Sequence, residues 1–375
     1  MMILKSSLPN IFAMPILIAN GLFLLGKSTS VAQSLKFEIF SAFVPAPSTT
    51  RGQNIHIYSD PKTGRIAYPN GKNIIIRDLE NPSKTFVYSG HTYQTTVAAF
   101  SPSGFYVASG DLMISVPTNY TTIDVNGNVR IWDTVGEDHI LKSTFRPLSG
   151  PIRDLQWDSD NQRILAVGEG KERFGHVFTF DSGNSVGVID GHSKVINGCS
   201  IRHKRPFRAA TCSDDFTVVF FQGTPYKFIK TIRDHSAFVN DVKFSPDGSY
   251  FVSVGSDYKI FLYDGATGDL ISQISDAKDD HKGTIYAVSW SPDSNHIMTS
   301  SADKSVKIWN VQSKTLERTI KISKNASNGP LDMQLGNVWT KNGLVSLSLS
   351  GDLNVLDLNS DSPISVYKLY SFSAL

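Results

Sequence analysis

The stretch at residues 281–310 carries the clearest pattern of apolar and polar positions in the chain. Its runs at 285–290 and 306–309 are rich in β-branched and aromatic residues, and a third run lies at 296–300. Ser-Pro-Asp and Ala-Asp-Lys clusters separate the three runs, and clusters of these residue types are typical of tight turns. The stretch therefore predicts three short strands, which cannot bury both of their faces without neighbours.

Close copies of this stretch recur upstream. They begin at His235, His192 and His91, and the Ser-Pro-Asp turn keeps its offset in the copy at His235. The positions that close each copy recur at one fixed offset, in the pairs Asp303 and Trp309, Asp257 and Tyr263, Asp215 and Phe221, and Asn126 and Trp132. A period in the low-to-mid forties with Gly-His at one end and Trp-Asp at the other is the WD-repeat signature, which indicates four-stranded blades around a central axis.

The repeats predict an all-β fold, a seven-bladed WD-repeat β-propeller, over residues 34–358. We expect its blades to close near Ile76, Trp132, Phe180, Phe221, Tyr263, Trp309 and Leu356. Residues 1–33 and 359–375 fall outside the repeats, as a leader and a non-repeat tail. Residues 34–44 read as a strand, which is a candidate to complete the last blade and close the ring.

WD-repeat proteins carry a buried hydrogen-bonded network of a His, a Ser or Thr, a turn Asp and the strand-end Trp. The matching positions are His281, Thr299, Asp303 and Trp309, then His235, Ser253 and Asp257, then His192, Thr211 and Asp215. A buried Asp is costly unless it is paired or receives several hydrogen bonds. Because these residues repeat from blade to blade, as an active site would not, we interpret them as structural groups and not as acid–base or metal-binding groups.

Composition narrows the function classes. The formal net charge is +2, from 36 basic and 34 acidic residues, so nothing global indicates nucleic acid or an acidic surface as a partner. The two cysteines, Cys199 and Cys212, are too few for a disulfide framework, and we expect reduced, buried thiols. The sequence contains no GxSxG, HExxH or metal-spaced Cys/His cluster, so we predict neither an enzyme nor a cofactor.

The leader at residues 1–33 has an apolar run at 11–25, followed by small residues up to Ala32. This order resembles a secretory signal peptide cleaved after Ala32, and Pro15 interrupts a length barely adequate for a membrane anchor. The alternative is an upstream extension from a wrong start in the gene prediction. Residues 21–28 also match the phosphate-loop pattern GxxxxGK[ST], but the Leu-Phe-Leu-Leu centre and the poor helix that follows indicate a chance match.

Blade 2 contains an insertion at residues 112–124, between its expected second and third strands. The insertion is either an extended surface loop or translated non-coding sequence. Asn119-Tyr-Thr within it fits an N-glycosylation acceptor, which matters only if the chain is secreted.

Blade 3 departs furthest from the repeat consensus. It opens with Leu148-Ser-Gly-Pro in place of Gly-His, and Phe174 stands where other blades have a turn Asp or Asn. Its centre, GEGKERFGH at 168–176, places charges and an aromatic residue in an expected exposed turn, which is the composition of an interaction site. The alternative is a Gly-rich hairpin with solvated charges and a tucked Phe. The basic run at 202–208 is more consistent with a solvated loop than with phosphate binding, since no second basic stripe supports it.

The sequences SGPIRDLQWD at 149–158, VGEGKERFGHVF at 167–178 and FDSGNSVGVIDGHSKVIN at 180–197 are specific beyond generic WD repeats. They resemble the actin-interacting protein 1 family, and the resemblance covers residues 34–357. It implies a non-catalytic protein that binds actin filaments carrying cofilin (actin-depolymerising factor) and promotes their disassembly. By motif match it implies an actin- and cofilin-binding site at Asp158, Asp160, Glu169, Lys171, Glu172, Arg173 and Phe174.

Three features depart from that family: its members have tandem propellers whereas this chain stops where a second would start, and the leader and the blade 2 insertion are unexpected. Translated intron sequence in an imperfect gene prediction accounts for all three, and a secreted single-propeller relative is the alternative. Because actin is intracellular, we expect the cytoplasm and the cortical actin cytoskeleton, with no membrane partner. The competing function is that of a WD-repeat adaptor for another protein complex, such as a ubiquitin ligase or an RNA-processing assembly.

Overall fold

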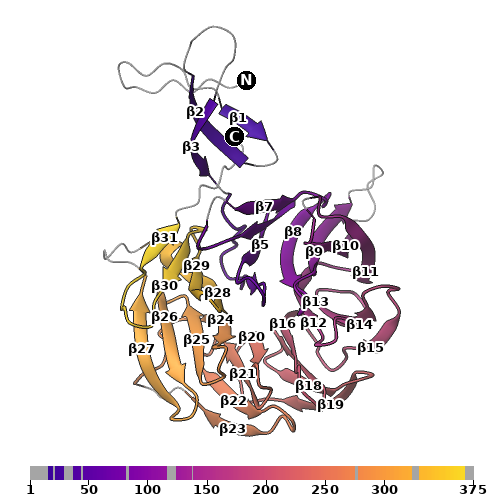
Figure 1. Ribbon diagram of the computed structural model, residues 1–375. Coiled ribbons are helices and arrows are strands. Elements are labelled where there is room, and N and C mark those ends of the chain that lie inside the picture. The colour runs from indigo at the N-terminus through magenta and orange to yellow at the C-terminus, as the bar shows by residue number, and fades with distance from the viewer. Residues whose placement is uncertain are drawn as a thin grey trace.

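The computed structural model describes residues 16–19, 22–28, 37–43, 45–81, 84–115, 124–136, 138–274, 278–322 and 329–367. Side chains are described from residue 45 onward, except at 113–115 and 124–126. Figure 1 shows seven four-stranded antiparallel sheets arranged as blades around a common axis. The prediction of a seven-bladed propeller is confirmed.

Each blade consists of four strands that are consecutive in the chain, with the first nearest the axis and the fourth at the rim. Blades 1 to 3 contain β4 (Tyr58–Ser59), β5 (Ile66–Asn70), β6 (Asn73–Arg77) and β7 (Thr85–Tyr88), then β8 (Gln94–Phe100), β9 (Tyr106–Ser115), β10 (Asp124–Asp133) and β11 (Leu141–Leu148), then β12 (Ile152–Trp157), β13 (Arg163–Gly168), β14 (Gly175–Thr179) and β15 (Ser185–Val188).

Blades 4 to 7 follow the same order. They contain β16 (Ile196–Ile201), β17 (Arg208–Ser213), β18 (Val218–Gln222) and β19 (Lys227–Ile232), then β20 (Val239–Phe244), β21 (Tyr250–Gly255), β22 (Ile260–Asp264) and β23 (Leu270–Gln273), then β24 (Ile285–Trp290), β25 (His296–Ser301), β26 (Ser305–Asn310) and β27 (Thr315–Lys321), then β28 (Gln334–Thr340), β29 (Gly343–Ser348), β30 (Leu353–Leu356) and β31 (Ser365–Tyr367). A short 3₁₀ helix, η1 (Pro330–Asp332), precedes β28.

The hydrophobic core is divided among the spaces between adjacent blades. In one such space Val97 and Ile131 of blade 2 pack with Leu155 and Ile164 of blade 3. The second strands of blades 3 to 7 are buried along nearly their whole length, because both of their faces meet a neighbouring blade. The buried positions include hydroxyl side chains as well as apolar ones, such as Thr299 and Ser300 in β25 and Ser346 in β29.

The predicted turns fix the strand order within a blade. In blade 6 the Ser291 hydroxyl donates to Oδ1 of Asp293 at 2.5 Å and accepts from the His296 amide at 2.9 Å. The Ser-Pro-Asp turn therefore holds β24 beside β25.

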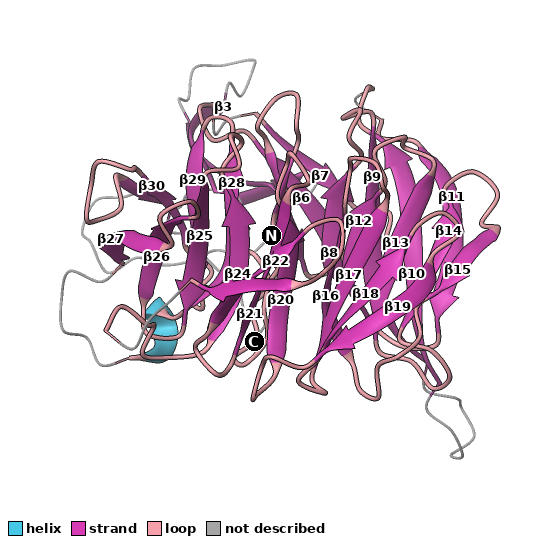
Figure 2. Cartoon of the chain, turned by 90° about the horizontal axis from the view of Figure 1, so that it is seen from below, coloured by secondary structure: helices cyan, strands magenta, loops and turns pink. Residues whose placement is uncertain are grey.

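Seen from the side, the strands run between two faces of the disk (Figure 2). We call the loop face the one that carries the connections between blades and the loops joining second to third strands. The turn face carries the turns that join first to second and third to fourth strands. Any two segments at opposite ends of one strand therefore lie on different faces.

Blade 7 does not take a strand from residues 34–44, so that expectation is wrong. β3 (Phe37–Phe43) pairs with β2 (Leu22–Ser28), which pairs with β1 (Ile16–Ala19), in a separate sheet outside the ring (Figure 1). The fourth strand of blade 7 is β31, which pairs with β30 and lies within the stretch that we assigned to a tail. A three-residue strand carries too little pattern to be found from sequence.

The ring closes through contacts between blades 1 and 7. The Ile55 amide donates to the Leu335 carbonyl at 3.0 Å, and the Tyr367 hydroxyl donates to the Leu79 carbonyl at 3.0 Å. Ile57 and Ile75 of blade 1 share a cluster with Val345 of blade 7. Both backbone bonding and apolar burial thus join the first blade to the last.

The blade 2 insertion continues two strands of the sheet. Pairing between β9 and β10 extends to Ser115 and Asp124. Residues 116–123, with the Asn119 acceptor, lie outside the described residues. In the leader, the phosphate-loop pattern falls on strand β2 and not on a loop before a helix, while Gly21 and Ala32 are outside the described part.

Candidate functional site

The predicted network residues lie together in blades 4, 5 and 6. In blade 6, His281 places Nδ1 2.8 Å from Oδ2 of Asp303 and Nε2 2.8 Å from Oγ1 of Thr299. The indole of Trp309 donates to the same Thr299 hydroxyl at 3.0 Å. Blades 4 and 5 repeat the first two contacts, at 3.0 Å for His192 to Asp215, 2.8 Å for His192 to Thr211, 2.9 Å for His235 to Asp257 and 2.7 Å for His235 to Ser253.

The network carboxylates are held in their ionised form. Burial by itself would raise the pKa of Asp303, but hydrogen bonds from His281 and Ser305 outweigh it and hold the pKa well below its ordinary value. The pKa of Asp215 is low for the same reason, with His192 and Thr217 as donors. Burial also lowers the pKa of His281, against the pull of Asp303. A neutral His and an ionised Asp is therefore the state that blade 6 stabilises.

Blade 2 contains a fourth network, which sequence reasoning missed. His91 lies 2.8 Å from Asp111 and 2.6 Å from Ser109, and Trp132 donates to Ser109 at 3.0 Å. The insertion had displaced the turn position, so the offset to Trp132 pointed to Asn126 instead. The signal that could have found it is the 18-residue separation of His91 and Ser109, which blades 5 and 6 share.

Both ring nitrogens of each network His are engaged inside its blade. A general base needs a nitrogen within reach of substrate, and a metal-binding His needs a free lone pair. The networks therefore supply rigidity to the blades and no reactive group.

The blade 3 loop at 169–174 lies on the loop face, between β13 and β14. Glu169 is half-buried and forms an ion pair with Arg153 of the inner strand β12. The Lys171 amide donates to Ser149 at 2.8 Å, while the side chains of Lys171, Glu172 and Arg173 are exposed. A Cβ atom on Gly168 would overlap the Pro151 carbonyl oxygen, so the loop needs its glycine to pack this closely.

Phe174 anchors that loop to the blade. Its ring is half-buried and packs against the cluster formed by blades 3 and 4, which includes Val167 and Tyr226. The Phe174 ring therefore fixes the base of the loop, and the exposed charged residues 171–173 keep a fixed position on the loop face.

Asp158 and Asp160 lie on the other face. The Asp158 side chain is buried, accepts from the amides of Gln162 and Arg163 at 2.8 and 3.1 Å, and pairs with the Arg163 guanidinium at 2.7 Å. Its carboxylate is thus committed to the turn between β12 and β13. Asp160, two residues on, is exposed.

The predicted interaction residues therefore fall into two groups that the structure does not bring together. Strand β13, six residues long, separates the turn at Asp158 from the loop at Glu169. At about 3.3 Å per residue this is roughly 20 Å. A single flat contact reaches one group or the other, unless the partner wraps around the edge of the disk.

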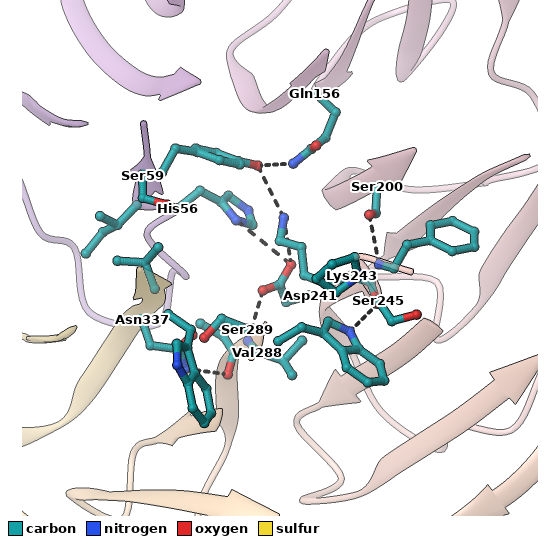
Figure 3. Close-up of a pocket in the computed structure, with 18 of the residues that line it drawn as sticks. His56, Ser59, Gln156, Ser200, Asp241, Lys243, Ser245, Val288, Ser289 and Asn337 are labelled. Carbon is teal, nitrogen blue, oxygen red and sulfur yellow. Dashed lines mark hydrogen bonds and ion pairs between the residues drawn. The ribbon is translucent and has the colours of Figure 1, made fainter. Parts of the chain in front are cut away.

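The centre of the propeller holds a buried charged cluster that the sequence did not reveal, and Figure 3 shows three of its members, His56, Asp241 and Lys243. Lys243 of β20 places Nζ 3.3 Å from Asp154 of β12 and 3.4 Å from Asp241 of its own strand. His56, ahead of β4, lies 3.8 Å from Asp154 and 3.9 Å from Asp241. The similar strand sequences IRDLQW and VNDVKF, each with Asp as its third residue, are the signal that could have found the two carboxylates.

Opposite charges within the cluster keep Asp154 and Lys243 ionised. Burial would raise the pKa of Asp154, but His56 and Lys243 lower it below its ordinary value. Burial would lower the pKa of Lys243, yet the carboxylates of Asp154 and Asp241 raise it well above. The cluster thus joins the inner strands of blades 1, 3 and 5 across the axis, beside a cavity of about 340 Å³.

His56, Asp154 and Asp241 are also the described residues best placed to hold a metal, since their ligand atoms lie within 4.8 Å of one another. Carboxylate and imidazole groups suit a divalent cation. The Lys243 ammonium already lies within ion-pair distance of both carboxylates, however. A metal ion here would compete with that cation, so the donor set fits a lysine better than a metal.

The remaining candidate chemistry is structural. In the basic run at 202–208, Arg202 is buried and donates to the carbonyls of Gly248 and Pro206, both at 2.7 Å, so part of the run holds a turn and is not solvated. Cys199 and Cys212 are buried free thiols in two different clusters, as expected. Among the described residues no helix has the length and apolar character needed to cross a bilayer.

The family model "WD domain, G-beta repeat" matches residues 82–133, 183–222, 226–264 and 274–310. The chain is 45% identical over 340 residues to WD repeat-containing protein 1 of Gallus gallus, which is 90% of this chain and 53% of the relative. It is 45% identical to the protein of the same name from Rattus norvegicus, with the same coverage. It is 43% identical over 333 residues to Actin-interacting protein 1 of Drosophila melanogaster, which is 88% of this chain and 52% of the relative.

The chain thus spans about half the length of the curated relatives it matches. The aligned 340 residues include blade 3, most of which the WD repeat model leaves unmatched. Blade 3 also carries the motifs that resemble the actin-interacting protein 1 family. With the seven-bladed propeller, these matches show that the chain belongs, over the part of its relatives that it spans, to the actin-interacting protein 1 family of WD-repeat proteins.

Proposed function

We propose that this propeller is a non-catalytic actin-binding module that cooperates with cofilin to promote the disassembly of actin filaments, in the cytoplasm and at the actin cytoskeleton. The observation that carries the proposal is the similarity to a protein named Actin-interacting protein 1, together with the exposed charged loop of blade 3. The WD-repeat fold itself does not require exposed charges such as Glu172 and Arg173 on a glycine-bounded loop anchored by Phe174.

The loop face of blade 3 is the part of the predicted site best suited to contact a partner. Lys171, Glu172 and Arg173 offer charges of both signs on a short loop whose base is fixed. Fixed loops lose little conformational entropy on binding, so more of the contact energy appears as affinity. Asp160 on the turn face remains a second proposed contact, and Asp158 would act by shaping the turn that presents it.

A filament-disassembly assay tests this function. Preformed actin filaments are mixed with cofilin, then the full chain is added and the filament mass that still pellets is followed over time. We expect faster loss of filament mass than with cofilin alone, and little loss when cofilin is omitted. An unchanged rate in the presence of cofilin would contradict the disassembly activity while leaving binding to be measured separately.

A further inference from the structure

The loop face of blades 4 and 5 carries exposed aromatic side chains that the repeats do not require. Phe216 is 40% exposed and Phe238 is 44% exposed, and their ring centroids lie 5.5 Å apart. Lys194 places Nζ 5.6 Å from the first centroid and 5.8 Å from the second. We call Lys194, Phe216 and Phe238 the aromatic patch.

The backbone under the patch is unusual for such residues. Phe216 follows the network residue Asp215 and has φ of +70°. Tyr258 holds the same position after Asp257, with φ of +68° and 43% exposure. Left-handed backbone is unfavourable for a bulky side chain and inexpensive for glycine. Lys304 holds the same position after Asp303 in blade 6, with φ of +68°, so the left-handed backbone belongs to the turn of the repeat. What is particular to blades 4 and 5 is that an exposed aromatic side chain occupies this position, which points to a role at the surface.

The patch is continuous with the blade 3 loop. A hollow of about 460 Å³ on the loop face is lined by Phe238, Asp214 and Arg153, among others. Arg153 is the residue whose guanidinium pairs with Glu169 of that loop. One surface therefore runs from the charged tip of blade 3, across the hollow, to the rings of Phe238 and Phe216.

We propose that the aromatic patch is a second docking point for the cofilin-decorated actin filament, so the inference rests on the proposed function. The occupant is a protein segment that presents an apolar side chain beside a carboxylate. The apolar group packs on the rings of Phe216 and Phe238, and the carboxylate pairs with Lys194. Among the described residues Lys194 contacts the two rings and forms no salt bridge, so a carboxylate of the partner can pair with its ammonium. Aromatic residues with an adjacent cation are typical binding hot spots.

The test compares the affinity of the full chain for cofilin-decorated filaments, by co-sedimentation, with that of three variants. Phe216→Ala with Phe238→Ala removes both rings, Lys194→Glu reverses the charge, and Phe216→Gly removes one ring while relieving the left-handed strain. The matched control is Phe105→Ala with Lys62→Glu. Phe105 is 49% exposed with the Lys62 ammonium 3.8 Å from its centroid, but it lies on the turn face.

We expect the double ring variant and Lys194→Glu each to weaken binding by tenfold or more, and the control to stay within about twofold of the unmodified chain. Phe216→Gly is expected to weaken binding while raising the midpoint of thermal unfolding, which separates lost contact from lost folding. Unchanged affinity in all three variants, with the unmodified chain binding well, overturns the patch alone. Failure of the unmodified chain to bind would overturn the proposed function and the patch with it.

Discussion

The Nζ atom of Lys243 lies 3.3 Å from Oδ2 of Asp154, and this contact joins blade 5 to blade 3 across the centre of the ring. Most other polar contacts between blades link neighbours, as when the Val288 amide donates to Asp241 of the preceding blade at 3.0 Å. A contact between blades that are not adjacent constrains the ring as a whole. At the height of Lys243 the centre of the propeller is therefore occupied by a charged cluster that holds the blades together.

Replacing Lys243 with Met tests this role. The change leaves two buried carboxylates facing each other, and breaking a buried charge network costs about 3–5 kcal/mol in the free energy of unfolding. The matched control is Lys230→Met, which removes an ion pair with the fully exposed Asp269, where solvent screens the attraction and little stability should be lost. Urea unfolding measures both, and equal small losses would show that the central cluster does not stabilise the ring.

The His–Asp networks differ between blades in a way that mutation can resolve. Thr299→Val in blade 6 leaves Nε2 of His281 and the indole N–H of Trp309 without their shared partner, at about 1–3 kcal/mol for each atom. Thr211→Val in blade 4 removes only the partner of His192 Nε2, because Phe221 stands where Trp309 stands in blade 6. We expect the first variant to lose more stability than the second in urea unfolding. A larger loss for Thr211→Val would contradict a network energy set by these bonds.

Acidification is expected to act on the blade 6 network before it acts on the carboxylates. Burial holds the pKa of folded His281 below its ordinary value, whereas the unfolded chain takes up a proton as the pH falls through about 6.5. Stability linked to His281 is therefore present above that pH and decreases below it. The low pKa values of Asp215 and Asp303 add stability that is present above about pH 4 and decreases toward their folded values.

Comparing the thermal midpoints of the unmodified chain and His281→Gln isolates the contribution of His281 to the pH dependence of stability. At pH 7 the variant should be clearly less stable, and the difference should shrink as the pH falls from 7 to 5. A difference that stays constant over that range would mean that the protonation of His281 is not linked to folding.

The repeat pattern predicted the blades because it recurs along the whole propeller. One irregular copy, such as blade 3, therefore does not hide the period. Features that depend on one short or displaced segment were missed. The three residues of β31 carry no pattern, and the insertion moved the turn so that Asp111, not Asn126, meets His91. The central cluster was missed because its members come from blades that are distant in sequence. The two groups of proposed contact residues looked continuous in sequence, but β13 places them on opposite faces.

That separation makes the two faces distinguishable by mutation. We expect Glu172→Ala with Phe174→Ala, on the loop face, to weaken binding to cofilin-decorated filaments by about tenfold. Asp160→Ala, on the turn face, should change binding by less if the loop face is the main contact. Co-sedimentation at matched protein concentrations measures both. A stronger effect of Asp160→Ala would assign the main contact to the turn face instead.

Cofilin-dependent binding to actin filaments is measured by pelleting the full chain with actin filaments in the presence and absence of cofilin. We expect the folded chain to pellet strongly with filaments that carry cofilin and weakly with bare filaments. The control contains cofilin and the chain without actin, where both should stay in the supernatant. A folded chain that stays in the supernatant with cofilin-decorated filaments would contradict the proposed binding.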